Sequence, residues 1–358
     1  MKGRALGSGG QVTLVIMTFD RPAYLQECLA SVARQTLAGF RLVVLDNAST
    51  ADLSGVLNRF RDLPMSYVRN ETNIGAAGNF RKAIRCYSDS KYLIVFHDDD
   101  MMHPRMLEWE LGLLESDPEI QFVSTDLTEF DDGEAPPRAI RENSALDVEI
   151  YDNQSDLARS LLGGGRLCYG STMYRSSVLG RLDLLAYERL GSFGDRPFLL
   201  DVARLGKSAL IRAPLVLSRQ HPGQDTNTGS ITVQNVVELM RAYREALPSD
   251  WSRADQDLFY GYARHFLPQF GYVHLAPEER IGAAPFIRKC VRNRVLRFRD
   301  VRPTGLAIML RADGMRALPA AIDAARAVKR RCLPRPRRAE GNPMPSSGER
   351  GQVRHPEE

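Results

Sequence analysis

Two hydrophobic patterns alternate along the first 130 residues. Short continuous apolar runs are typical of strands buried on both faces of a sheet. Between them, apolar residues recur three and four positions apart, which predicts amphipathic helices. This alternation predicts βαβ units and a largely parallel sheet flanked by helices, an α/β fold. The predicted strands cover 12–17, 41–46, 65–69, 92–96 and 120–125, and the predicted helices cover 22–35, 53–61, 76–87 and a stretch after Pro104.

A cluster of polar residues follows each of four predicted strands. In parallel sheets ligands bind outside the carboxyl ends of the strands, where these clusters fall. We therefore expect four loops to line one crevice. The clusters are residues 18–21, 46–50, 70–79 and 97–100.

The remaining chain changes character twice. Residues 128–152 are polar with little periodicity, which predicts a mobile surface loop, and 223–230 is a second predicted loop. A helical pattern then covers 233–291. We predict a disordered start over 1–10, an α/β domain over 11–230, a helical basic region over 231–333 and a disordered, Pro- and Gly-rich tail over 334–358.

The formal net charge of +4 conceals an asymmetry along the chain. Residues 280–338 hold 17 Lys and Arg against 3 Asp, whereas residues 1–279 hold 29 basic and 37 acidic residues. Apolar residues alternate with Arg in the basic region, so it is a candidate contact for an anionic membrane surface. A helical appendage packed on the first domain is the alternative. Neither nucleic-acid motifs nor many aromatic residues accompany the charge, which argues against nucleic acid as a partner.

Targeting and redox signals are weak. No run of 18 apolar residues and no apolar leader occurs, so we expect a cytoplasmic protein, with the basic region as its contact with the inner face of the membrane. The 5 cysteines are scattered and form no CxxC pair, which argues against zinc and against a disulfide framework.

The stretch "IVFHDDDMMHP" carries the most informative chemistry. Asp98, Asp99 and Asp100 follow a strand directly, and like charges so close together cost free energy unless a cation offsets them. Carboxylate oxygens at a strand end suit Mg²⁺ or Mn²⁺ shared with a substrate diphosphate. The alternative is a solvated acidic turn that caps the helix beginning near Pro104.

Four stretches in this order resemble the family 2 glycosyltransferases, which have the GT-A fold: "VTLVIMTFDRPAYLQECLASVARQT", "RLVVLDNAST", "NIGAAGNFRKAI" and "HDDDMMHP". The resemblance covers residues 12–219. It implies a GT-A catalytic domain over 11–230, a Rossmann-like nucleotide-sugar fold with a mixed, mainly parallel sheet, followed by an α-helical appendage.

The resemblance also implies roles for single residues. Asp46 would accept a hydrogen bond from the pyrimidine ring, which selects uracil or thymine over cytosine. Asp98 would contact the ribose and Asp100 the metal, with Asp99 as the alternative in either role, because His97 stands where many relatives carry a further Asp. The implied donor-binding residues are Thr18, Phe19, Arg21, Asp46, Asn73, Gly75, Asp98, Asp99 and Arg219, and the implied metal ligands are Asp100, Asp98 and His221.

A second element, "FGDRPFLLDVARLGK", resembles the one that holds the family's general base. Asp195 matches that base, while Gly194 replaces the Glu that usually precedes it. The alternative role of Asp195 is an N-cap for the helix that follows. The glycine run over 161–175 lies where the family places acceptor-side residues, and a plain Gly-rich bend is its alternative.

Together these features predict a metal-dependent inverting glycosyltransferase. It would move a sugar from a UDP- or dTDP-sugar to a hydroxyl of a glycan or lipid-linked acceptor, in surface polysaccharide biosynthesis. One alternative is a nucleotidyltransferase, although "TFDRPAYLQ" lacks the Gly-rich basic loop that such an enzyme needs. The other is a non-catalytic sugar- or nucleotide-binding relative.

Overall fold

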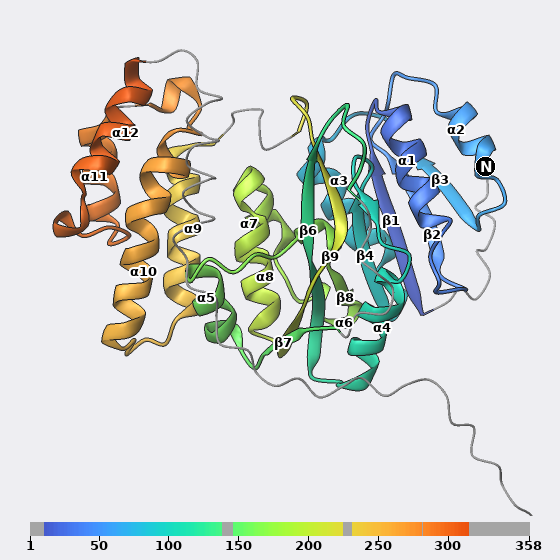
Figure 1. Cartoon of the computed structure of the whole chain (residues 1–358), viewed down its shortest axis with the longest axis horizontal. Helices are drawn as coiled ribbons and strands as arrows, with labels where there is room; N and C mark the ends of the chain where they lie inside the picture. The colour runs from blue at the N-terminus through green and yellow to red at the C-terminus, as the bar shows by residue number, and fades with distance from the viewer. Residues whose placement is uncertain (1–10, 138–145, 225–230, 281, 315–358) are drawn as a thin grey trace, which may run out of the picture.

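The computed structural model describes residues 11–137, 146–224, 231–280 and 282–314. Within these ranges one mixed sheet stands between two layers of helices, and further helices cover the outside of one layer (Figure 1). The strand order is β3-β2-β1-β4-β8-β6-β9-β5, with β7 paired to β9. The strands are β1 (Val12–Thr18), β2 (Arg41–Asp46), β3 (Met65–Arg69), β4 (Tyr92–His97), β5 (Met101–Met102), β6 (Ile120–Asp131), β7 (Val148–Tyr151), β8 (Met173–Arg175) and β9 (Lys207–Gln220).

Helices follow the strands as the hydrophobic pattern predicts. They are α1 (Pro22–Val32), α2 (Ser54–Arg59), α3 (Gly75–Tyr87), α4 (Met106–Ser116), α5 (Gln154–Leu162), α6 (Ser176–Leu179), α7 (Leu184–Glu188) and α8 (Asp195–Ala203). α1 and α4 pack on one face of the sheet, and α3, α5 and α8 pack on the other.

The predicted parallel sheet is confirmed in its first half. β1 pairs in parallel with β2 and with β4, and β2 pairs in parallel with β3. The second half is mixed, because β8 runs antiparallel to both β4 and β6 while β9 runs parallel to β6. The carboxyl ends of β1, β2, β3 and β4 therefore meet at one edge of the sheet, as the polar clusters predicted.

Side chains of the central strands feed two separate cores. Leu14 and Ile16 of β1 pack on the side of α1 and α4, whereas Val15 faces the side of α3 and α8. All three side chains are fully buried. Burying one aliphatic side chain contributes about 1.5–3 kcal/mol, so the continuous apolar runs provide the energy that joins the two helical layers to the sheet.

The C-terminal helices form a third layer against α5 and α8 (Figure 1). Their side chains continue the α3/α8 core, with Tyr243, Phe259 and Phe286 fully enclosed. The helices are α9 (Val233–Ala246), α10 (Arg253–Phe266), the π-helix η4 (Leu267–Tyr272), α11 (Ala283–Arg292) and α12 (Pro303–Gly314). No helix among the described residues combines the length and the apolar character needed to cross a bilayer.

The predicted loop over 128–152 is wrong at both of its ends. β6 continues to Asp131, and β7 occupies Val148–Tyr151. The register between β6 and β9 shifts on both sides of Asp126, and such a bulge interrupts the two-residue period by which a strand is recognised. Residues 138–145, most of the predicted loop 223–230, and the predicted disordered segments 1–10 and 334–358 lie outside the described residues.

Candidate active site

The three aspartates form a buried turn between β4 and β5. Each is at most 7% exposed, although all follow the end of a strand directly. The side chain of Asp98 turns toward the loop after β1, where it accepts hydrogen bonds from the Thr18 hydroxyl at 2.6 Å and the Phe19 amide at 3.4 Å. The predicted meeting of the first and fourth strand ends is therefore present.

Asp99 and Asp100 also contact residues at the end of β9 and just beyond it. The Oδ2 atom of Asp99 lies 2.8 Å from the Arg21 guanidinium and 3.0 Å from Nε2 of His221. Asp100 accepts the backbone N–H of Arg219 at 3.1 Å. The end of β9 thus packs against the aspartate turn from a part of the chain that lies 120 residues further on.

The electrostatics of the turn are unbalanced. Burial raises the pKa of Asp98 to about 7, and the charge of Asp99 adds to this rise. Burial and the same neighbouring charge hold the pKa of Asp100 well above its ordinary range. For Asp99, the upward effect of burial is outweighed by His97, His221 and Arg21, so its pKa is lowered. The turn therefore favours an additional cation.

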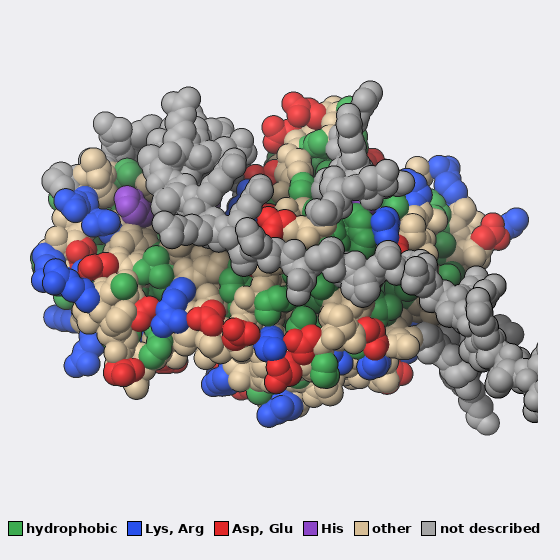
Figure 2. Space-filling model, turned by 60° about the horizontal axis from the view of Figure 1, so that its bottom comes forward, with side chains coloured by type: hydrophobic (Ala, Val, Ile, Leu, Met, Phe, Trp, Pro, Cys, Tyr) green, Lys and Arg blue, Asp and Glu red, His purple; other side chains and the backbone are tan. Residues whose placement is uncertain are grey.

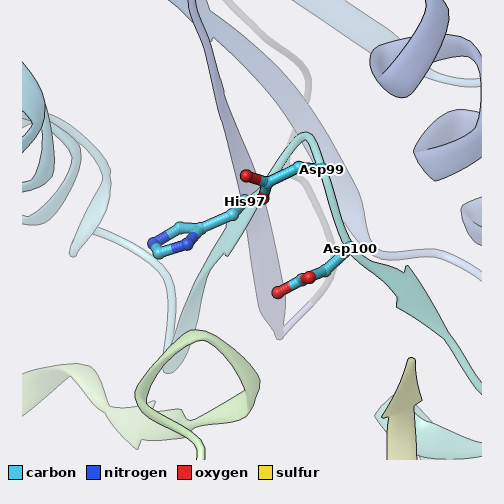
Figure 3. A group of neighbouring side chains, drawn as sticks. All are labelled: His97, Asp99 and Asp100. Carbon is cyan, nitrogen blue, oxygen red and sulfur yellow. The ribbon is translucent and has the colours of Figure 1, made fainter. Parts of the chain in front are cut away.

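Three side chains could hold that cation together. Ligand atoms of His97, Asp99 and Asp100 lie within 4.8 Å of one another (Figure 3). One imidazole nitrogen and carboxylate oxygens form a donor set that Mn²⁺ or Mg²⁺ accepts. The buried, partly uncompensated carboxylates make this group fit a divalent ion.

This grouping differs from the predicted ligands Asp98, Asp100 and His221. Asp98 accepts the Thr18 hydroxyl and lies 3.5 Å from Arg21, while Nε2 of His221 lies 3.0 Å from Asp99. The physical reason is that the residues after His97 form a turn, so their side chains no longer alternate as in a strand. Sequence reasoning missed His97, although its place at the end of β4, next to the aspartates, was a usable signal.

Asp46 ends β2 and is fully buried. Its carboxylate accepts the amide of Ser49 at 2.9 Å, the hydroxyl of Ser49 at 2.6 Å and the hydroxyl of Tyr67 at 2.6 Å, and Arg69 Nε lies 3.4 Å away. These donors occupy the roughly four acceptor positions of a carboxylate. A pyrimidine N–H could reach Asp46 only by replacing Tyr67 or Arg69, two residues that the sequence did not single out.

The loop after β3 is held by amide side chains. The Asn73 side-chain oxygen accepts from the Asn47 amide at 2.8 Å and from the backbone N–H of Gly75 at 2.8 Å. Gly75 begins α3 with a φ of +75°, a conformation that favours glycine. Asn73 is exposed, so its predicted donor contact stays open to a ligand.

Asp195 is the first residue of α8, and Gly194 is the N-cap residue. The carboxylate of Asp195 accepts the backbone N–H of Arg196 at 2.7 Å, and the Arg196 Nε lies 3.7 Å away. Its side chain keeps 31% of its surface exposed. Burial raises the pKa of Asp195, and the charge of Arg196 opposes that rise. Asp195 is therefore not the N-cap but an accessible carboxylate held beside a cation.

The backbone explains why no Glu precedes Asp195. A Cβ at Gly194 would lie 2.4 Å from the carbonyl oxygen of Tyr187, so no side chain fits there. The turn Tyr169–Ser171, from the predicted acceptor-side glycine run, lies between Asp195 and the acidic turn. A Cβ at Gly170 would touch the His97 ring at 3.9 Å, and the charge of Asp195 contributes to the raised pKa of Tyr169.

Comparison with known proteins agrees with this geometry. Residues 13–182 match the model of the family described as glycosyl transferase family 2. Through this stretch, which is slightly less than half of the chain, the protein is similar to glycosyl transferase family 2.

Relatives of this chain are distant. A Haemophilus influenzae protein described as an uncharacterized glycosyltransferase is 29% identical over 112 residues, which are 31% of this chain and 37% of that protein. The amylovoran biosynthesis glycosyltransferase AmsE of Erwinia amylovora is 27% identical over 124 residues, which are 34% of this chain and 46% of AmsE. The match spans less than half the length of both relatives.

A solved structure shows that the fold extends beyond the family match. TarS residues 1–349 of S. aureus, solved with UDP, aligns with a TM-score of 0.55 and 17% identity over 89% of this chain and 90% of that one. The fold predicted for this chain, a GT-A nucleotide-sugar transferase fold, is therefore confirmed.

Arg219, near the end of β9, is held more tightly than predicted. It is 4% exposed, its guanidinium pairs with Glu27 and with Asp132, and it stacks over the rings of Tyr24 and Phe130 at 4.6 and 4.8 Å. Its predicted contact with the diphosphate would require the guanidinium to leave both carboxylates. The contact stays a prediction, and the described contacts make Arg219 a support for the aspartate turn.

A second supporting residue, Asp20, was missed. It has a φ of 54° and joins the loops after β1 and β2, because its carboxylate accepts the backbone N–H groups of Thr50 at 2.6 Å and Ala51 at 2.8 Å. A left-handed conformation at a non-glycine residue costs free energy and persists where the surroundings impose it. The adjacent Phe19, predicted to contact the donor, is 38% exposed.

Proposed function

We propose that this chain transfers a sugar from a nucleotide diphosphate donor to an acceptor hydroxyl, with inversion at the anomeric carbon. The observation that carries the proposal is the buried acidic turn Asp98–Asp100, which sits at the carboxyl ends of parallel strands in the stretch that is similar to family 2. A divalent cation would offset the negative charge of the aspartates, and the same cation would bind the diphosphate of the substrate. Ligands of α/β proteins bind at the carboxyl ends of parallel strands, where this turn lies.

The donor would lie across the ends of β1, β2 and β4. Thr18, Phe19 and Arg21 come from the first loop, and Asp98 would take the ribose. The hydroxyl of Thr18 now occupies the Asp98 oxygen that the ribose would use. A uridine or thymidine base would pair with Asp46 after displacing the Tyr67 hydroxyl. TarS, which shares the fold, has been solved with UDP and with UDP-GlcNAc, and this supports a uridine donor.

A divalent cation would be held by Asp100 and Asp99 together with His97, with Asp98 and His221 as neighbours. When bound, it supplies positive charge against the leaving diphosphate. Arg21, 26% exposed and 2.8 Å from Asp99, is the side chain of this chain best placed to reach the same phosphates.

Asp195 would act as the general base. It would take the proton of the acceptor hydroxyl while that oxygen bonds to the anomeric carbon, and the bond between this carbon and the diphosphate oxygen breaks. A pKa raised by burial makes Asp195 a better proton acceptor than an ordinary Asp, while the charge of Arg196 opposes that rise. Inversion follows from this single displacement.

The acceptor would be a hydroxyl of a glycan or of a lipid-linked sugar, in surface polysaccharide biosynthesis. The description of the relative AmsE, a glycosyltransferase of amylovoran biosynthesis, supports this class of acceptor. Contact of the basic C-terminal region with an anionic membrane would bring the enzyme to such an acceptor, and it belongs to the same proposal.

The test is release of nucleoside diphosphate from a panel of UDP- and dTDP-sugars, with lipid-linked and soluble glycan acceptors and Mn²⁺. The wild type should turn over one donor, and Asp195→Asn should reduce transfer by about 10²–10⁴-fold with unchanged donor affinity. Asp201→Asn is the matched control, because Asp201 lies on the same helix and bonds Tyr187 instead. Donor binding without turnover in the wild type would replace the proposal by the non-catalytic alternative.

A further inference from the structure

A pocket lined by arginines lies between two helices of the C-terminal layer. These helices, α9 and α11, stand apart from the first strands of the sheet (Figure 1). The pocket is open, has a volume of about 290 Å³, and is formed by α9 and the end of α11. Its lining consists of Arg241, Arg244, Glu245, Arg292, Asn293 and Arg294. Four guanidinium groups and one carboxylate thus share one concave surface.

Among the described residues, the positive charges in this pocket are only partly balanced by carboxylates. Arg241 pairs with Glu238 at 2.9 Å and donates to the Asn293 side chain at 2.6 Å, which ties α9 to the end of α11. For Arg244, Arg292 and Arg294, the described part of the chain offers no carboxylate within ion-pair distance. Like charges gathered in one pocket repel one another unless an anion joins them.

The backbone at Arg294 gives a second, independent indication. α11 ends in a Schellman motif, in which the N–H of Val295 donates to the carbonyl of Cys290 at 3.1 Å and the N–H of Arg294 to that of Val291 at 2.9 Å. The residue at the centre of this motif is usually Gly, because it needs a positive φ. Here it is Arg294, with a φ of 59°.

An arginine in a glycine position is unfavourable for folding. A β-carbon in the left-handed conformation costs free energy, so the helix end alone would be better served by Gly. The turn, however, directs the chain so that Arg294 lines the same pocket as Arg292 and Arg244. Strain that folding does not require is a reason to look for function in the side chain.

We propose that the pocket formed by Arg241, Arg244, Arg292 and Arg294 binds a phosphate or diphosphate group. Arginine presents paired N–H donors that match two phosphate oxygens at once, which suits a multivalent anion better than a single carboxylate. The surface around the C-terminal helices is rich in Lys and Arg (Figure 2) and would attract such a ligand from a distance. The group belongs to an anionic phospholipid or to a soluble phosphorylated molecule.

The first experiment is a calorimetric titration of the full chain with inorganic pyrophosphate, with EDTA present so that no divalent ion assists binding at the acidic turn. Arg292→Ala with Arg294→Gly should weaken binding about tenfold or more, since charge-assisted hydrogen bonds to two guanidinium groups are lost. Arg288→Ala is the matched control, because Arg288 is exposed on α11 but does not line the pocket. It should bind like the wild type.

A stability measurement keeps this test independent of misfolding. Arg294→Gly removes the strained β-carbon, so this variant should melt at a higher temperature than the wild type while it binds pyrophosphate less tightly. A gain of stability combined with a loss of binding is the signature of a residue retained for its ligand. Unchanged pyrophosphate affinity in a stabilised Arg294→Gly would contradict a phosphate site that uses this residue.

Vesicle sedimentation distinguishes the two sources of phosphate. If the pocket binds a lipid head group, equimolar phosphatidylcholine and phosphatidylglycerol vesicles should carry down the wild type and Arg288→Ala but not the double variant. If the ligand is soluble, pyrophosphate should separate the variants while the vesicles do not. If neither pyrophosphate nor vesicles separate the double variant from Arg288→Ala, the proposal is wrong.

Discussion

Glu110 on α4 offers a sharp test of how burial governs this structure. Its side chain is fully buried, and neither carboxyl oxygen has a hydrogen-bond partner among the described residues. Burial therefore holds the pKa of Glu110 well above its ordinary value of 4.5. Its neighbour on the same helix, Glu108, pairs with Arg105. The hydrogen bonds that Glu108 accepts lower its pKa, so it carries no comparable cost of burial.

The sign of the effect follows from proton linkage. Above pH 4.5 the unfolded Glu110 loses its proton while the folded one keeps it, so ionisation favours the unfolded state. Each pH unit in this window costs about 1.4 kcal/mol of unfolding free energy. As the pH rises above 4.5, the wild type should therefore lose unfolding free energy relative to Glu110→Gln, whose side chain never ionises, for as long as the folded carboxyl keeps its proton.

The assay is urea denaturation of wild type, Glu110→Gln and Glu108→Gln at several pH values from 5 to 8. The stability of Glu110→Gln relative to wild type should rise steadily with pH. Glu108→Gln should differ from wild type by an almost constant amount over this range, because the lowered pKa of Glu108 makes stability depend on pH only near and below its ordinary value of 4.5. A difference between Glu110→Gln and wild type that does not change with pH would refute the reasoning, since it would mean that the folded carboxyl is ionised and has a partner.

Three further changes have defined outcomes. Tyr67→Phe should tighten UDP binding about two- to tenfold in calorimetry, because Asp46 then has one donor fewer to give up to the base; weaker binding would mean that the Tyr67 hydroxyl itself contacts the nucleotide. Gly194→Ala should lower the unfolding free energy by about 1–3 kcal/mol in denaturation, since its Cβ would meet the Tyr187 carbonyl oxygen; a neutral result would show that this turn moves easily. Asp195→Asn should reduce transfer by about 10²–10⁴-fold but leave donor binding unchanged, as measured by product release and by calorimetry; equal turnover would show that Asp195 is not the base.

The fold could be predicted well where burial alone decides the pattern. Strands at 41–46 and 65–69 and the βαβ order came directly from apolar runs, and the structure has them at the same residues. The strand β6 was cut short in the prediction because its bulge near Asp126 and its polar second half break the alternation. Pairing of β6 with β9 joins residues far apart in the chain, which local patterns cannot show.

For the candidate site, the sequence predicted which loops carry the functional residues, but not which way their side chains point. Sequence located the acidic turn and Asp195, but the direction of each carboxylate depends on turn geometry after His97. It also depends on Arg219, whose backbone reaches Asp100 from the end of β9. Tyr67 and Arg69 occupy Asp46 across neighbouring strands, and no spacing rule identifies such cross-strand contacts.

One measurement tests the central claim that the acidic turn binds a nucleotide diphosphate with a divalent ion. It is calorimetry with UDP, dTDP, GDP and CDP, each with and without Mn²⁺, on wild type and Asp100→Ala. The account predicts that UDP or dTDP binds only with Mn²⁺ and that Asp100→Ala loses this binding, while GDP and CDP bind weakly. If no nucleotide binds the wild type with or without Mn²⁺, the acidic turn is not a donor site and the proposed transfer is contradicted.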